Sequence, residues 1–255
     1  RGLVGSEMCI RDSELALNAV YELAGIGSKA IDPLVKSLLK YSGQELRPYR
    51  KDIKEISEVF HPREWNEGAY ALQDEAYALG AMGEPALDAL INLLKCDDQW
   101  IKINAAFALG EIGKPAAPAI PILIKQLEDD HHQVVRAILD ALACIGGNVR
   151  AALPTIRKLL TTSNPAWQEV PVGRGWTGEN QLRMNAMLLL LTSDIAASEI
   201  EDLLVSTFQD PNGYVPALAI EALSQDGTPT GMRAALDFLK THRWDDTLAK
   251  ERRVF

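Results

Sequence analysis

A six-residue phrase of small and apolar residues that ends in glycine recurs along this chain. The clearest copy is Ala-Leu-Gly-Glu-Ile-Gly at 108–113, and related copies lie at 22–27, 78–83 and 141–146. The last three copies end 30 and 33 residues apart. Self-similarity at this period is typical of repeat arrays, in which each unit stacks on the next and all units share a continuous core.

Each unit is expected to contain two helices. Around the clearest copy, apolar residues recur at helical spacing up to Gly113, which supplies the left-handed residue that ends many helices. Pro115 and Pro118 follow and suit the first turn of a second helix. Hydrophobic residues make up 47% of the chain and aromatic residues only 6%, which favours closely packed helices over a β-sandwich.

A gap-free internal match at an offset of 81 residues supports this interpretation. It pairs Lys102 with Arg183 and Asp129 with Asp210. The offset exceeds two 33-residue units by 15 residues, which places an insertion between 161 and 180. The predicted fold is an all-α, right-handed solenoid of about six helix pairs. The pairs are expected at 14–40, 69–95, 99–128, 131–161, 180–209 and 214–240.

The repeated residues resemble a known family. Asp97, Ile101 and Lys102, followed by the phrase at 108–113, are similar to HEAT-like repeats, especially the short class first noted in phycobilisome lyases. The resemblance covers roughly 14–40 and 69–240, which is most of the chain. It implies a fold and almost nothing about activity. The phrase is altered in two units, where Leu191 and Asp194 replace its glycines and where Ser224-Gln225-Asp226 interrupts it.

The repeats predict a domain organisation. Residues 1–13 fit no repeat and resemble a translated sequencing adaptor of the kind found in metagenomic assemblies, so we expect a non-native or unstructured leader. Residues 14–240 form the solenoid, with insertions at 41–68 and 163–179. Residues 241–255 form a cap or a truncated end.

Aromatic residues gather in and beside the two insertions. Trp65 and Tyr70 accompany the first, and Trp167, Arg174 and Trp176 lie in the second, the last two within a glycine-rich run. Such aromatics can fill the mismatch between unequal units. They can also anchor a partner, since Trp, Tyr and Arg are enriched at interaction hot spots and insertions carry function in solenoids. Both interpretations stay open.

Three lysines occupy equivalent positions in successive units: Lys95, Lys125 and Lys158. The resemblance to HEAT-like repeats implies that the second helices line a concave face, where these ammonium groups could form a basic stripe for an acidic or phosphate-bearing partner. The alternative is ordinary, because a lysine near a helix C-terminus complements the helix dipole.

The sequence assigns no residue to catalysis or to metal binding. The chain contains neither His-Glu-x-x-His nor Gly-x-Ser-x-Gly. His131 and His132 are expected in a solvated turn, and Cys144 is expected at a core position. No catalytic residue, metal ligand or cofactor is therefore predicted, and an enzyme is the less favoured interpretation.

Charge and cysteine usage restrict the partners. The net charge of −9 and the pI near 5.0 disfavour a nucleic-acid binder, including a HEAT-like DNA glycosylase with a cationic groove. No stretch approaches the roughly 18 apolar residues of a membrane span, so no membrane partner is expected. The three cysteines follow no pairing or zinc pattern, which weakly favours a cytoplasmic location.

The sequence therefore favours a non-catalytic interaction or scaffold module. It would bind a protein or peptide on its concave face and its aromatic insertions. Two alternatives stay open: a bilin-lyase-like HEAT enzyme or chaperone acting on a chromophore-bearing protein, and the recognition arm of a larger enzyme.

Overall fold

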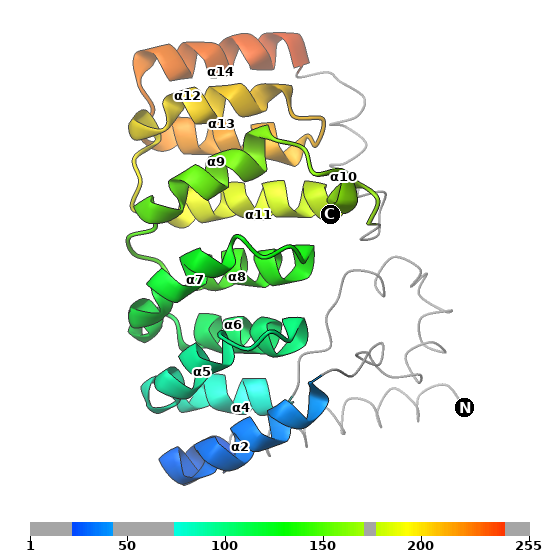
Figure 1. Ribbon diagram of the computed structural model, residues 1–255. Helices are drawn as coiled ribbons and strands as arrows, with labels where there is room; N and C mark the ends of the chain where they lie inside the picture. Colours follow the sequence, from blue (N-terminus) through cyan, green and yellow to red (C-terminus); the bar gives the residue numbers. More distant parts are fainter. Residues whose placement is uncertain (1–21, 43–73, 171–176, 243–255) are drawn as a thin grey trace, which may run out of the picture. The chain divides into compact units, whose positions relative to one another are not determined.

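The computed structural model describes residues 22–42, 74–170 and 177–242, and all of their regular elements are α- or 3-10 helices (Figure 1). The chain divides into two compact units, Arg1–Ile145 (unit 1) and Gly146–Phe255 (unit 2). Each unit is a stack of helix pairs, so the predicted all-α solenoid is confirmed. Among the described residues, no helix combines the length and apolar character that a bilayer crossing demands.

Unit 1 stacks first helices on one another and packs second helices against them. The first helices α4, α6 and α8 are in contact in that order, and α5 and α7 pack on α6 and α8. Short 3-10 turns join the two helices of each pair, and η5 contains both prolines expected to open a second helix. The elements are η1 (Gly27–Ala30), α2 (Ile31–Leu38), η2 (Leu39–Tyr41), α4 (Asp74–Met82), η4 (Glu84–Ala86), α5 (Leu87–Leu93), α6 (Gln99–Ile112), η5 (Lys114–Ala119), α7 (Ile120–Gln126) and α8 (His132–Ile145).

Unit 2 repeats this arrangement. Its first helices α11 and α13 are in contact, and α9, α12 and α14 are their second-helix neighbours. The short helix α10 lies between α9 and α11 in the sequence. The elements are η6 (Arg150–Ala152), α9 (Leu153–Thr161), α10 (Pro165–Gln168), α11 (Gly178–Thr192), η7 (Ala197–Glu199), α12 (Glu201–Ser206), η8 (Thr207–Gln209), α13 (Tyr214–Asp226) and α14 (Pro229–His242).

The two glycines of the repeated phrase have different structural roles. The last one, as at Gly113, has φ +68°, a conformation that other residues adopt only with strain. The earlier one permits close helix packing. A Cβ added to Gly80 would lie 2.9 Å from the Cβ of Glu111, and one added to Gly110 would lie 3.3 Å from the Cα of Ala141. In unit 1, therefore, the first helices approach nearly backbone to backbone.

The core follows the same periodicity. Leu79, Leu109 and Leu142 occupy equivalent positions in α4, α6 and α8 and are fully buried. Cys144 is exposed, so its expected core position is wrong. Because successive helix residues are about 100° apart, Cys144 lies roughly 200° around α8 from Leu142 and faces away from the stripe that the core covers.

Replacing Leu109 with alanine tests this register. The side chain is fully buried, so its loss should lower the free energy of unfolding by about 2–5 kcal/mol through lost burial and the cavity left behind. Urea denaturation measures the change. Leu239→Ala, at a position 40% exposed on α14, is the control and should cost much less. Equal losses for the two variants would contradict the register.

Candidate binding site

The insertion predicted at 163–179 is bordered by capped helices. The Asn164 side chain accepts a hydrogen bond from the Ala166 amide at the start of α10. At the other border, Thr177 and Asn180 form a reciprocal capping box at the start of α11. The sequence therefore specifies where this segment leaves the helical stack and where it returns.

A buried carboxylate ties the two borders together. Glu179 Oε1 accepts a hydrogen bond from the Asn164 amide at 3.2 Å, and Oε2 accepts one from Ser163 Oγ at 3.2 Å. The amide of Gly178 also donates to the Val170 carbonyl at 2.9 Å. These contacts join the described residues on both sides of the segment, so its two borders are held side by side.

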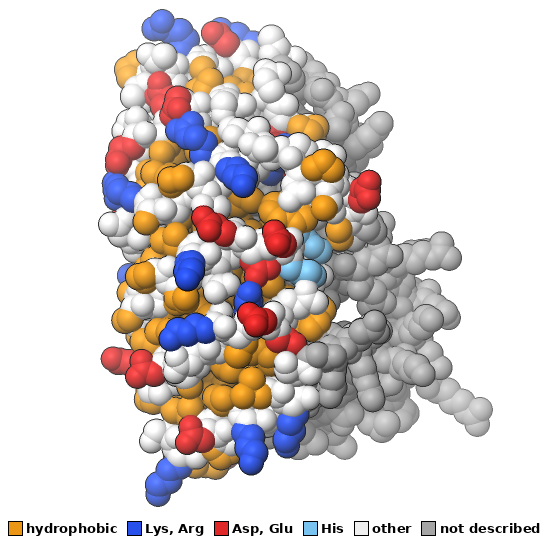
Figure 2. All heavy atoms as spheres, viewed as in Figure 1, with side chains coloured by type: hydrophobic (Ala, Val, Ile, Leu, Met, Phe, Trp, Pro, Cys, Tyr) orange, Lys and Arg blue, Asp and Glu red, His pale blue; other side chains and the backbone are white. Residues whose placement is uncertain are grey.

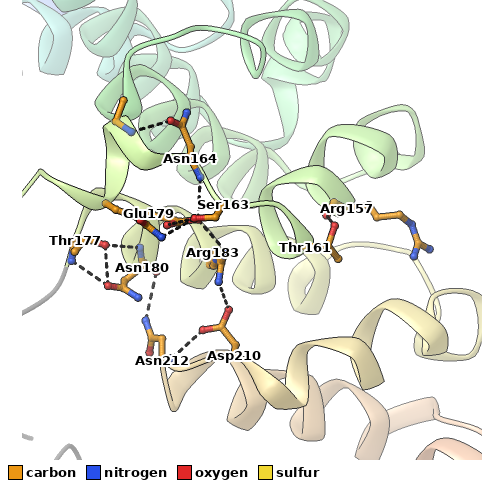
Figure 3. A network of polar contacts seen from close by, with 12 residues as sticks. Arg157, Thr161, Ser163, Asn164, Thr177, Glu179, Asn180, Arg183, Asp210 and Asn212 are labelled. Atoms are coloured by element: carbon orange, nitrogen blue, oxygen red, sulfur yellow. Dashed lines mark hydrogen bonds and ion pairs between the residues drawn. The ribbon is translucent and has the colours of Figure 1, made fainter.

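The carboxylate is itself held by an ion-pair network (Figure 3). Arg183 lies between two acids, with Nη2 2.9 Å from Glu179 Oε1 and Nη1 2.7 Å from Asp210 Oδ2. The exposed fractions of the Arg183, Glu179 and Asp210 side chains are 13%, 7% and 3%. Charges so well removed from water are stable only when paired. The network therefore fixes Ser163, Asn164 and Glu179, which together form the loop base, at a rigid point of unit 2.

Unit 1 contains the corresponding ion pair. Lys102 Nζ lies 2.6 Å from Asp129 Oδ2, and both this pair and Arg183–Asp210 join residues 27 positions apart. The pair therefore belongs to the repeat itself. Asp98, which the 81-residue offset aligns with Glu179, caps α6 and accepts a hydrogen bond from Ser42 Oγ at 3.2 Å.

The predicted site residues divide into three groups. Trp167 lies half-buried on α10, beside the loop base. Three exposed lysines lie at the C-terminal ends of second helices: Lys95 just after α5, Lys125 in α7 and Lys158 in α9. Lys95 and Lys125 are in unit 1 and Lys158 is in unit 2. The remaining candidates lie outside the described residues: Trp65, Tyr70, Arg174 and Trp176.

The surface chemistry is mixed on the face shown in Figure 2. Lys and Arg side chains alternate there with Asp and Glu among apolar side chains, rather than forming a field of one sign. Lys95 Nζ donates to Asn92 Oδ1 at 2.9 Å, and Lys125 and Lys158 lie in the last turns of their helices, where a lysine complements the helix dipole. The basic stripe therefore stays a prediction.

Sequence reasoning missed the network around Glu179. The signal was present, because the internal match at offset 81 aligned Lys102 with Arg183 and Asp129 with Asp210. It aligned the members of each pair separately, however, and their contact across 27 residues appears only once the helices stack.

The expectation of a solvated histidine turn is wrong for His132. This residue begins α8, is only 7% exposed, and its ring stacks on that of His131 with centroids 5.3 Å apart. Burial, followed by the neighbouring His131 and Arg136, lowers the pKa of His132 from 6.5 to about 4. No group of three potential metal-ligating side chains occurs in the described parts of the chain.

Comparison with known proteins identifies the class of repeat. Residues 75–143 match the family model of HEAT repeats, so the resemblance to these repeats is confirmed there. The search of curated proteins finds no match.

Three solved structures align with most of this chain. An engineered protein is 18% identical with a TM-score of 0.42, and the match covers 88% of this chain and 90% of that one. A designed armadillo repeat protein in complex with the peptide (KR)4 is 17% identical with a TM-score of 0.38, covering 89% and 91%. A structure of the complex of CpcE and CpcF of phycocyanin lyase from Nostoc sp. PCC7120 is 22% identical with a TM-score of 0.36, covering 88% and 82%.

Removing Glu179 tests the loop base. Glu179→Ala should lower the free energy of unfolding by about 2 kcal/mol, because Arg183 and the Asn164 amide lose a buried acceptor. It should also speed tryptic cleavage after Arg174. The matched control is Glu199→Ala, since Glu199 pairs with Arg150 at 2.7 Å but both side chains are nearly half exposed. That variant should lower the free energy of unfolding much less, because water screens an exposed ion pair. Similar losses in the two variants would show that the network does not stabilise the loop base.

The lowered pKa of His132 predicts a pH dependence of stability. Between pH 4 and 6.5 the unfolded chain binds a proton here that the folded chain does not, so stability falls as the pH drops through this window. The loss should be on the order of 2–3 kcal/mol. His132→Leu should flatten the pH profile of urea denaturation, whereas Gln133→Leu should keep the original slope. An unchanged slope in His132→Leu would disprove the assignment.

Proposed function

We propose that this chain is a non-catalytic binding module for a protein or peptide, and that the loop at 163–179 is its principal contact. Stacked helical repeats present extended surfaces to partners, and a loop that leaves such a rigid scaffold is a common place for binding residues. The network that joins Glu179, Arg183 and Asp210 beneath this loop is the observation that carries the proposal.

The base of the loop lowers the cost of binding. A freely moving segment of this length loses conformational entropy when a partner orders it, and this loss weakens affinity. The contacts from Glu179 to Ser163 and Asn164 have already brought the two ends of the loop together. The conformational freedom left to lose on binding is correspondingly smaller.

The residues that the loop carries suit a polypeptide partner. Arg174 offers a planar donor group and Trp176 a large apolar ring, and both residue types are enriched among the side chains that dominate binding energy. Trp167 adds a second indole on α10. The secondary contacts in this proposal are Trp65 in the first insertion, Tyr70 just after it, and Lys95, Lys125 and Lys158.

Peptide selection tests the proposed contact without a known partner. A phage-displayed library of random 12-residue peptides is selected against the full chain, and affinities of the enriched peptides are measured by biolayer interferometry. A double variant, Arg174→Ala with Trp176→Ala, should bind them at least tenfold more weakly, which corresponds to the loss of about 1.4 kcal/mol. Its free energy of unfolding should change by less than about 0.5 kcal/mol.

The control is Arg233→Ala, which removes an exposed arginine from α14 of the same unit. It should keep full affinity. The proposal fails if no peptide family is enriched or if the enriched peptides bind the double variant as well as the unchanged chain. A large loss of stability in the double variant would instead assign its two residues to the core.

A further inference from the structure

Unit 2 contains a pocket at the end of α11 that is remote from the loop. Its volume is about 230 Å³. The C-terminal parts of α11 and α13 and the turn that leads into η7 form its walls. Its lining includes Leu191, Asp194, Ile195, Ile200, Gln225 and Asp226.

Comparison with unit 1 explains why the pocket is there. The internal match aligns Leu191 with Gly110 and Asp194 with Gly113. In unit 1, Gly110 lets α6 approach Ala141 of α8 closely. In unit 2, Leu191 has the bulk that Gly110 lacks, and the aligned partner, Ala222, lines the pocket. The pocket therefore coincides with the altered phrase in this unit.

The turn after α11 also differs from its unit 1 counterpart. Where α6 ends at a glycine with φ +68°, α11 ends at Ser193 in an extended conformation with φ −86° and ψ 169°. Ser193 Oγ donates to the Leu190 carbonyl and accepts from the Ile195 amide. After this exit the chain bends at Asp194 before η7 begins, and Asp194 lines the pocket where unit 1 has only a glycine.

The electrostatic character of the pocket is negative. Asp194 and Asp226 are exposed at its rim, and Asp226 Oδ1 accepts the Ala197 amide at 2.9 Å, which fixes that carboxylate. The C-termini of α11 and α13 add the partial negative charge of their carbonyl groups. The nearby Arg150 is paired with Glu199 at 2.7 Å, and its Nη2 lies 3.5 Å from the carbonyl oxygen of Asp194.

We infer that this pocket binds the arginine or lysine side chain of a partner polypeptide. Its lining is mixed: Ile195 and Ile200 offer apolar contact to the methylene stem of a basic residue, and the two carboxylates suit the charged head. The volume lies below the roughly 300–1,000 Å³ typical of drug-sized ligands, and so fits a single side chain. The inference rests on the proposed binding function and adds the chemistry of one partner residue.

The pocket and the loop at 163–179 adjoin the same helix. The two sites lie at opposite ends of α11, whose 15 residues span about 22 Å. Roughly seven residues of extended peptide cover that distance. A partner segment that contacts both the pocket and the loop therefore needs at least about that length.

A monovalent peptide tests the pocket directly. The probe is an acetylated, amidated pentapeptide with one central arginine among alanines and glycines, and its counterparts carry lysine, citrulline or norleucine instead. Two-dimensional NMR titration of the full chain follows the amides of Ala196, Ala197 and Asp226. The arginine or lysine probe should cause saturable shifts there. Citrulline and norleucine should bind at least about tenfold more weakly, since both lack the charge.

Two variants and a control complete the test. Asp194→Asn with Asp226→Asn keeps hydrogen-bond acceptors in place and should weaken binding of the basic probe at least about tenfold. Gln225→Lys places a lysine beside the pocket, and its ammonium group should occupy the pocket and so exclude the probe. Asp237→Asn, at an exposed carboxylate on α14, should leave binding unchanged.

The outcomes separate this inference from the proposed function. Equal binding of the citrulline probe, absent shifts at the pocket, or equal weakening in Asp237→Asn overturns the inference. The variant lacking Arg174 and Trp176 should bind the monovalent probe normally. If the probe binds but selected library peptides ignore the loop, the pocket stands and the loop proposal fails. If the selected peptides require the loop but the probe does not bind, the pocket inference fails and the loop proposal stands.

Discussion

The close approach of consecutive first helices is the constraint on which this structure depends. An isolated helix pair cannot bury its apolar face, and it does so only by stacking on its neighbours. In unit 1 the approach requires glycine, since a Cβ at Gly80 would meet Glu111 at 2.9 Å. The fully buried leucines of α4, α6 and α8 follow from that proximity. In unit 2, where Leu191 stands at the aligned position, a pocket lies beside it.

Unit 2 thus carries distinctive features at both ends of α11. At its N-terminal end, buried charges hold the two borders of an inserted loop together around Glu179 and Arg183. At its C-terminal end, two exposed carboxylates line a small pocket. The rest of the helix is an ordinary repeat element with a buried face. We place partner binding where the sequence departs from its repeat, and we assign the regular repeats the role of rigid support.

The local features of the fold were predictable from sequence, because single residues carry them. The glycine at the end of each phrase and the prolines after Gly113 mark helix boundaries whatever the helices pack against. Leu109 belongs to the apolar residues that recur at helical spacing before Gly113, and it is fully buried. Features that depend on how the helices pack were not predicted correctly. His132 was expected in solvent and is buried, and Cys144 was expected in the core and is exposed.

The contacts of the candidate site also depend on stacking. Arg183 and Asp210 are 27 residues apart and meet only when α11 packs beside the turn before α13. The altered phrase at Leu191 and Asp194 was visible in the sequence, but the pocket beside it required the structure. Hydrogen–deuterium exchange of the full chain, with and without a selected library peptide, shows which segments a partner contacts. We expect added protection at 163–179 and at 190–197. Protection confined to α14 or to unit 1 would contradict this expectation.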